Sequence, residues 1–229
     1  MLEKNGTQGA PVETKKNSIV AALFTDEDGD VAWYRARIEG TLSPEEAGAA
    51  ASGAGGEKLF KVLFIDYGNV DAVPASMMRP VGSSTIAAIP ALARVCTLAF
   101  LRSKPIEDER LGEAARAALA HLTLNESFRC RIHGRDASNR MRVTLLPDSD
   151  EEGGEGYLGV ELMSAGFHRV SFLEARDAQR RIAEEESDPI ALADWQYVEK
   201  LREAEAEAKK AGENLWEFGD VADSDDEGR

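Results

Sequence analysis

Two stretches decide the fold of the first half of the chain: Trp33-Tyr34-Arg35-Ala36-Arg37-Ile38 and Val62-Leu63-Phe64-Ile65-Asp66-Tyr67-Gly68-Asn69. In the first stretch, apolar or aromatic residues alternate with arginines, the period-2 pattern of a strand with one buried face. The second stretch is a run of β-prone residues that ends in a tyrosine, a glycine and an asparagine, a composition typical of a turn. The two stretches therefore predict neighbouring strands of a small sheet.

Other short apolar runs surround these strands. The sequence predicts strands over 19–24 and 70–73, with an acidic turn over 26–30. Several short strands in about 60 residues favour a small closed barrel, because closure removes exposed sheet edges. Residues 43–57, rich in alanine, glycine, serine and glutamate, are expected to form a low-complexity insertion in this barrel.

Beyond the barrel the pattern changes to α+β. The sequence predicts strands over 93–101, 128–133, 141–145 and 167–172, helices over 107–122, 158–165 and 191–211, and a helix cap at Gly166. We therefore expect a chain that is α+β, mostly β. Its predicted parts are a flexible leader (1–17), the barrel (18–82), a helical connector (83–92), a second domain (93–219) and an acidic tail (220–229).

The charge of the chain is unevenly distributed. Its 229 residues carry 27 lysines and arginines against 42 aspartates and glutamates, a net charge of −15. Three acidic runs, in 148–155, 184–188 and 220–227, hold most of the excess and are typical of solvated loops or tails. Such an excess of negative charge disfavours non-specific binding to the phosphate backbone of nucleic acids. A local cluster still keeps an RNA-binding surface open as an alternative: Arg129, Arg131, Arg135, Arg140 and Arg142.

The cysteines and the N-terminal residues indicate the cellular compartment of the protein. Cys96 and Cys130 lie in apolar or alternating stretches, which indicates buried free thiols in a reducing compartment. Residues 1–17 are polar and lack the apolar core of a secretory signal. We therefore expect a cytoplasmic protein, possible in the nucleus as well, and a monomer that enters no membrane.

The sequence contains no recognisable catalytic constellation. His121, His133 and His168 do not have the spacing of a zinc site, and the acidic turn over 26–30 departs from a calcium loop. A nucleophile elbow, a Walker loop and a dinucleotide fingerprint are all missing. We therefore expect a chain without metal, cofactor or catalytic residues.

Aromatic residues are the most informative side chains of the predicted barrel. Six rings lie at strand ends beside turns: Phe24, Trp33, Tyr34, Phe60, Phe64 and Tyr67. Either all six rings form the core of the barrel, or some of them face a ligand. Rings around a pocket attract cations, and a methylated guanidinium suits them because methyl groups reduce its hydration and leave its charge.

The two stretches quoted first resemble the signature of the Tudor domain. Residues 201–216, with 162–170 before them, resemble the closing helix and the preceding segment of staphylococcal-nuclease-like domains. Together they are similar to the extended Tudor module of the Tudor staphylococcal nuclease family, over roughly residues 15–222. The resemblance implies a Tudor (SH3-like) barrel inserted into a nuclease-like OB-fold barrel that ends in a long helix.

The resemblance also implies a function. The family binds symmetrically dimethylated arginine of partner proteins in an aromatic cage, which corresponds here to Phe24, Tyr34, Phe64 and Tyr67, with Asn69 accepting from the guanidinium. The family often has tyrosine where this chain has Phe64. Partners would be proteins with methylated Arg-Gly segments, in a regulator of RNA processing or RNA silencing.

Two alternatives come from the nuclease-like half. The acidic strand motif that supplies part of the family's calcium site is missing from this chain, which disfavours a calcium-dependent nuclease. An RNA-binding module remains, because OB barrels combine a basic groove with stacking rings. The sequence therefore favours a non-catalytic recognition module, with nuclease activity residing in other domains of a longer relative.

Overall fold

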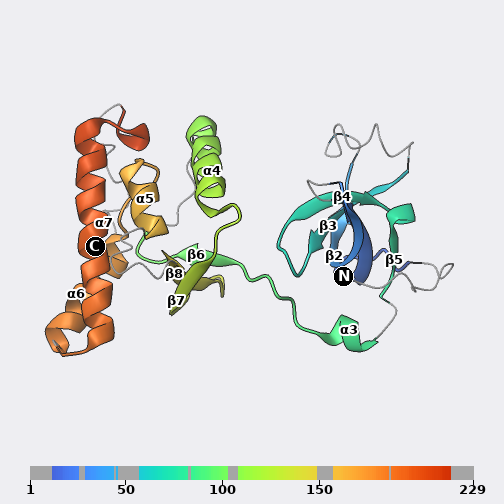
Figure 1. Cartoon of the computed structure of the whole chain (residues 1–229), viewed down its shortest axis with the longest axis horizontal. Coiled ribbons are helices and arrows are strands. Elements are labelled where there is room, and N and C mark those ends of the chain that lie inside the picture. The colour runs from blue at the N-terminus through green and yellow to red at the C-terminus, as the bar shows by residue number, and fades with distance from the viewer. Residues whose placement is uncertain are drawn as a thin grey trace. The chain divides into compact units, whose positions relative to one another are not determined.

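The computed structural model describes residues 12–25, 29–43, 45, 57–81, 84–102, 108–148, 157–185 and 187–217. The chain divides into two compact units, Met1–Val95 and Cys96–Arg229 (Figure 1). Most of the predicted leader and insertion and all of the acidic tail lie outside the described residues.

The first unit is one strongly curved antiparallel sheet. Its strands are β1 (Ile19–Thr25), β2 (Val31–Thr41), β3 (Leu59–Phe64), β4 (Val70–Pro74) and β5 (Met78–Pro80), in the order β4-β3-β2-β1-β5. The four predicted strands are confirmed. The short β5 follows a 3-10 turn, Ala75–Met77, and gave no detectable periodicity. The core of the barrel consists of Val20, Ala22, Ala36, Ile38, Phe60, Val62, Phe64, Val73 and Met78.

The predicted connector begins with a single short helix, α3 (Ser84–Ala88). The chain after α3 returns to the barrel, where the Ala93 amide donates to the Ile65 carbonyl at 3.1 Å. The connector is therefore part of the first unit up to Val95.

The second unit packs helices against a three-stranded sheet. Its elements are β6 (Cys96–Leu98), α4 (Glu109–Thr123), β7 (Phe128–Arg135), β8 (Met141–Pro147), α5 (Leu158–Ser164), α6 (Phe172–Glu184), α7 (Pro189–Ala211) and the turn η2 (Asn214–Trp216). The strand order is β6-β8-β7, and β6 runs parallel to β8. In Figure 1, α5 lies between α4 and the long α7.

These elements confirm a mostly β chain with several helices and a long C-terminal helix. The two units follow one another along the chain, with the division after Val95. Among the described residues, every strand of the second unit comes after the barrel.

Two local predictions in the second unit are wrong. Residues 167–172 form no strand but a single bridge between Leu101 and Val170, and the helix α6 begins at Phe172. This helix was missed because only Ala175 and Ala178 of it are buried, too small a set to give an apolar stripe. Cys96 and Cys130 are exposed rather than buried, since they lie on the two outer strands of the three-stranded sheet.

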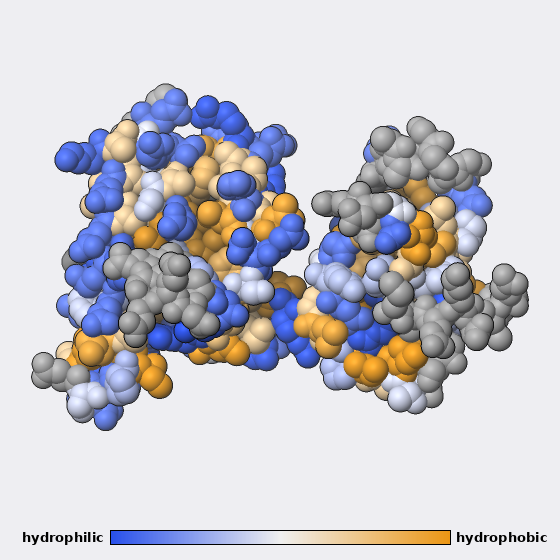
Figure 2. All heavy atoms as spheres, in the orientation of Figure 1, coloured by the Kyte–Doolittle hydropathy of each residue, from blue (hydrophilic) through white to orange (hydrophobic). Residues whose placement is uncertain are grey.

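The long helix α7 begins and ends as its sequence predicts. Asp188 caps its first turn by accepting from the Ile190 amide at 2.8 Å, Pro189 is the first helical residue, and Gly212 ends it in the left-handed conformation. No helix in the described ranges is both long and apolar enough to cross a membrane. Hydrophilic residues cover much of the face of this unit shown in Figure 2, with smaller hydrophobic patches between them.

Two glycines at the helix ends allow a controlled test of packing. Gly166 and Gly212 both have φ near +70°, but a Cβ on Gly166 would lie 2.4 Å from the Glu213 carbonyl oxygen, whereas the nearest atom to one on Gly212 is 3.9 Å away. We expect Gly212→Ala to lower the free energy of unfolding by about 1 kcal/mol, the cost of the left-handed conformation. Gly166→Ala should cost about 1 to 3 kcal/mol more, because the backbones must separate. Urea denaturation of both variants measures the difference, and equal losses would contradict it.

Candidate functional site

Four aromatic rings of the barrel lie in mutual contact. Phe24 comes from the end of β1, Tyr34 from β2, Phe64 from the end of β3, and Tyr67 from the turn after β3. The ring centroids of Tyr34 and Tyr67 are 5.2 Å apart, those of Phe24 and Phe64 also 5.2 Å, and Tyr34 lies 6.2 to 6.3 Å from both phenylalanines. All four contacts are edge-to-face, a favourable geometry for aromatic pairs.

The four rings differ in exposure. Phe64 is 1% exposed and belongs to the core, whereas Phe24 and Tyr34 are half-buried and Tyr67 is 68% exposed. A ligand could therefore contact Phe24, Tyr34 and Tyr67, with Phe64 supporting the first two from below. Phe64, which the resemblance places among the residues of the cage, therefore leaves almost no surface that a ligand could contact directly.

The turn that carries Tyr67 is closed by main-chain hydrogen bonds. The amides of Tyr67 and Gly68 donate to the Phe64 carbonyl at 3.1 and 2.7 Å, and the Phe64 amide donates to the Asn69 carbonyl at 2.9 Å. Gly68 has φ +91°, which the turn requires and which glycine adopts without strain. Asn69 is exposed in the same turn, two residues after Tyr67.

An ion pair fixes the residues next to the two tyrosines. Arg35, which follows Tyr34, donates from Nε to Asp66 Oδ2 at 2.9 Å and from Nη2 to Asp66 Oδ1. Asp66 precedes Tyr67. The side chain of Arg35 is 6% exposed and that of Asp66 18%, so the pair is a largely buried bidentate one, the strongest class of charged hydrogen bond.

Arg35 also binds the connector. Its Nη1 donates to the carbonyl oxygens of Ile86 and Ile89 at 2.9 and 2.6 Å, and the Leu92 amide donates to Asp66 Oδ1 at 3.3 Å. The hydrogen bond from Arg35 holds the pKa of the Asp66 carboxyl below its usual value, and Asp66 in turn raises the pKa of Arg35. One ion pair therefore joins β2, the turn after β3 and the segment after α3.

The two other aromatic residues of the barrel, Trp33 and Phe60, make different contacts. The guanidinium of Arg79 stacks on the Trp33 ring, 4.0 Å from its centroid, and Phe60 is 4% exposed in the core. Neither is among the four rings in contact.

The predicted basic cluster of the second unit is largely neutralised. Four of its five arginines lie near carboxylates: Arg129 near Asp148 (3.9 Å), Arg131 near Asp194 (3.5 Å), Arg140 near Asp136 (2.7 Å) and Arg142 near Glu174 (2.8 Å). The fifth, Arg135, donates to the Asn139 carbonyl at 2.8 Å. Two of these ion pairs, those of Arg131 and Arg142, join the sheet to the helices α7 and α6.

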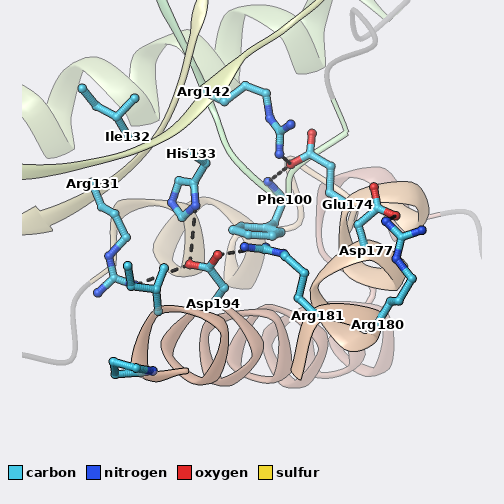
Figure 3. Close-up of a pocket in the computed structure, with 12 residues that line it drawn as sticks. Phe100, Arg131, Ile132, His133, Arg142, Glu174, Asp177, Arg180, Arg181 and Asp194 are labelled. Atoms are coloured by element: carbon cyan, nitrogen blue, oxygen red, sulfur yellow. Dashed lines mark hydrogen bonds and ion pairs between the residues drawn. The ribbon is translucent and has the colours of Figure 1, made fainter. Parts of the chain in front are cut away.

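One cluster of polar residues in the second unit was missed. Asp194 of α7, 1% exposed, accepts from Arg181 Nη2 at 2.9 Å and faces His133 Nδ1 at 3.5 Å (Figure 3). His133 Nε2 is 2.8 Å from Thr144 Oγ1. The sequence does contain a signal for this cluster. Asp194 lies between Ala191 and Tyr197 on the buried face of α7, and a buried carboxylate requires hydrogen-bonding partners. Among the described residues, no group of His, Cys, Asp and Glu is arranged to hold a metal ion.

The ion pair of Arg35 with Asp66 predicts that truncating the Arg35 side chain strongly lowers the stability of the fold. We expect Arg35→Ala to lower the free energy of unfolding by about 3 to 5 kcal/mol, since it leaves the largely buried Asp66 carboxylate without its partner. Arg37→Ala, which removes the more exposed pair with Glu39, is the matched control and should cost about 0 to 1 kcal/mol. Chemical denaturation followed by tryptophan fluorescence measures both, and similar losses would refute a special role of Arg35.

The same pair predicts a pH dependence. The pKa of Asp66 is lower in the folded chain than in the unfolded one, where it is about 3.9. Its contribution to stability is therefore complete above the unfolded pKa and is lost as the pH falls through the folded pKa. We expect the stability difference between the native chain and Asp66→Asn to be constant at neutral pH and to shrink below about pH 4. A difference that stays constant throughout acid titration would contradict this assignment.

Residues 1–99 match the family model of the Tudor domain. Ribonuclease TUDOR 2 of Arabidopsis thaliana is 31% identical over 230 residues, which cover 93% of this chain and 20% of the relative. The chain thus spans about a fifth of the length of the curated relatives it matches first.

Two solved structures have the same fold. The extended Tudor domain of Drosophila melanogaster Tudor-SN matches with a TM-score of 0.63 and 19% identity, covering 93% of this chain and 80% of that one. The human TDRD1 extended Tudor domain, solved with a symmetrically dimethylated peptide, matches with a TM-score of 0.52 and 21% identity over 71% of this chain and 69% of that one. The chain therefore contains a Tudor domain and has the fold of an extended Tudor domain.

Proposed function

We propose that the first unit binds a methylated arginine side chain of a partner protein among the rings of Phe24, Tyr34 and Tyr67. The observation that carries this proposal is the exposure of Tyr67, 68%, while its ring still contacts Tyr34. A large aromatic ring that lies mostly in solvent and contacts a second ring offers aromatic surface to a ligand.

The chemistry of the rings selects a methylated guanidinium. Aromatic faces attract a cation by about 0.5 to 2 kcal/mol for each contact, more when the cation is desolvated. Methyl groups lower the cost of removing water from the guanidinium and keep its charge, so a methylated arginine enters the site more easily than an unmodified one. Phe64, buried below, keeps Phe24 and Tyr34 in place, and the lack of a hydroxyl on it leaves the ligand-facing rings unchanged.

The partner that suits this site is a protein segment with symmetrically dimethylated Arg-Gly repeats. Asn69, exposed in the turn after Tyr67, supplies an amide oxygen that can accept from the remaining guanidinium N–H. The human TDRD1 extended Tudor domain, which has the same fold, was solved with a symmetrically dimethylated peptide, and this supports the proposal. A net charge of −15 would also attract arginine-rich segments over long range.

We propose that this chain acts by recognition and not by catalysis. The ribonuclease activity in the names of the Arabidopsis relatives belongs to proteins about five times as long. A place in RNA processing or silencing in the cytoplasm would follow from the proteins that carry the methylated segments. RNA binding by the second unit remains the alternative, and the paired arginines described above weaken it.

The methylarginine site is tested by calorimetric titration of the chain with one Arg-Gly peptide, unmethylated and symmetrically dimethylated. We expect tighter binding of the methylated peptide and a loss of about 2- to 30-fold in affinity in Tyr67→Ala, the equivalent of one cation–π contact. Tyr67→Phe should retain most of the affinity because it retains the ring.

The control for this experiment is Phe172→Ala. Phe172 is 66% exposed, close to the value for Tyr67, but lies on α6 of the second unit. Equal affinities for the two peptides, or an equal loss in both alanine variants, would overturn the proposal. Arg129→Glu, followed by titration with single-stranded RNA, tests the alternative, since that arginine is exposed and only distantly paired.

A further inference from the structure

The end of the connector runs along the turn after β3. The Ala93 amide donates to the Ile65 carbonyl at 3.1 Å, and the Leu92 amide donates to Asp66 Oδ1 at 3.3 Å. A Cβ placed on Gly68 would lie 3.4 Å from the Cβ of Ala93, which is ordinary van der Waals contact. The connector therefore lies directly against the turn that forms one side of the proposed methylarginine site.

The backbone of the connector is fixed at this place, while one of its large side chains is not buried. Arg35 donates to three carbonyl oxygens of the segment 86–90, which leads to Leu92. The side chain of Leu92 is nevertheless 71% exposed. A leucine on a fixed backbone loses little conformational entropy when a ligand covers it, because only its side-chain rotations are still free. Leu92 is therefore suited to contact a ligand.

The exposed ring of Tyr67 belongs to the same part of the barrel. Tyr67 follows Asp66, which accepts from the Leu92 amide, and precedes Gly68, which lies against the connector. Tyr67 and Leu92 are 68% and 71% exposed, so the described chain covers neither of them. Two large side chains with apolar surface thus lie on adjacent segments, and the surface open to a ligand extends from the aromatic rings to the connector.

The main chain of a bound peptide has to pass this surface when its arginine enters the rings. The guanidinium lies at the end of a long side chain, so the residues next to the arginine, about 3.3 Å apart along an extended chain, lie outside the rings. One or two residues on either side of the arginine can therefore reach Leu92. Arg94, two residues further along, is exposed and forms no ion pair with a described residue, so this surface favours an apolar neighbour over a second arginine.

We propose that Leu92 is a specificity-determining residue of the methylarginine site and packs against an apolar side chain within two positions of the methylated arginine. This inference rests on the proposed function of the first unit and adds a second requirement to it. The rings select the methylated guanidinium, and Leu92 selects the sequence around it. A valine or isoleucine suits this contact because a β-branched side chain has few rotamers to lose, whereas glycine offers no side chain. Among methylated Arg-Gly segments, those with such a neighbour bind most tightly.

The experiment uses the 229-residue chain and peptides with one symmetrically dimethylated arginine in a glycine background. One peptide contains only glycine around the arginine, and the others carry a single valine, one or two positions before or after it. In calorimetric titration we expect at least one valine peptide to bind about three- to ten-fold more tightly than the glycine peptide, the gain from partly burying two apolar side chains. In Leu92→Ala this gain should fall below about two-fold, because most of the apolar surface of the leucine is removed.

Leu124→Ala is the matched control, because Leu124 is 62% exposed at the end of α4 in the second unit, and this variant should retain the whole gain. Circular dichroism verifies that both variants fold. The preference for the methylated over the unmethylated glycine peptide tests the proposed function alone, since neither peptide offers Leu92 a side chain. A failure of the methylarginine site is therefore distinguishable from a failure of the contact with Leu92.

Three results would overturn the role of Leu92: no gain with any valine peptide, a gain that persists in Leu92→Ala, or a gain that Leu124→Ala abolishes equally. A dimer of the free chain in analytical ultracentrifugation that Leu92→Ala dissociates would overturn it as well, and would assign this surface to a second copy of the chain.

Discussion

The first unit depends on one ion pair, that between Arg35 and Asp66. Each partner is adjacent in sequence to a tyrosine of the aromatic cluster: Arg35 follows Tyr34 in β2, where successive residues point to opposite faces, and Asp66 precedes Tyr67 in the turn after β3. The pair is largely buried and bidentate, and Arg35 also binds carbonyl oxygens of the connector. Its charges are therefore neutralised and its donors satisfied, the condition under which a buried pair is tolerated. The pair therefore fixes the backbone next to Tyr34 and Tyr67 through residues that are themselves largely buried.

This arrangement separates stability from recognition. Phe64 is part of the core and packs under Phe24 and Tyr34, whereas the exposed ring of Tyr67 contributes little to burial. In the proposed function, a ligand that contacts Tyr67 need not displace any core residue, so the proposed site is formed before binding. Preformed aromatic walls lose little conformational entropy when a cation enters, because each ring has few rotatable bonds.

The aromatic cluster could be predicted because its residues belong to strands whose alternation is clear and to a turn whose composition is unambiguous. The burial of Arg35 could not be predicted: the alternating pattern indicates a solvent-facing residue, and only its partner Asp66, in a turn 31 positions away, gives Arg35 a reason to be buried. Helix α6 was missed for the opposite reason, since its two buried alanines leave almost no hydrophobic signal. Cys96 and Cys130 sit in apolar patterns, but β6 and β7 are outer strands, and a pattern predicts burial without specifying what covers the strand.

The arginines of the second unit show that local charge in a sequence does not reveal which carboxylates lie nearby in the fold. Five arginines within 14 positions suggest a basic surface, yet the carboxylates that neutralise two of them, Glu174 and Asp194, come from helices α6 and α7, more than 30 residues later. Asp194, almost fully buried, draws Arg131, His133 and Arg181 toward α7 and so couples the sheet to the helices. Ion pairs between elements that are far apart in the sequence therefore decide how the arginines of this strand pair are placed.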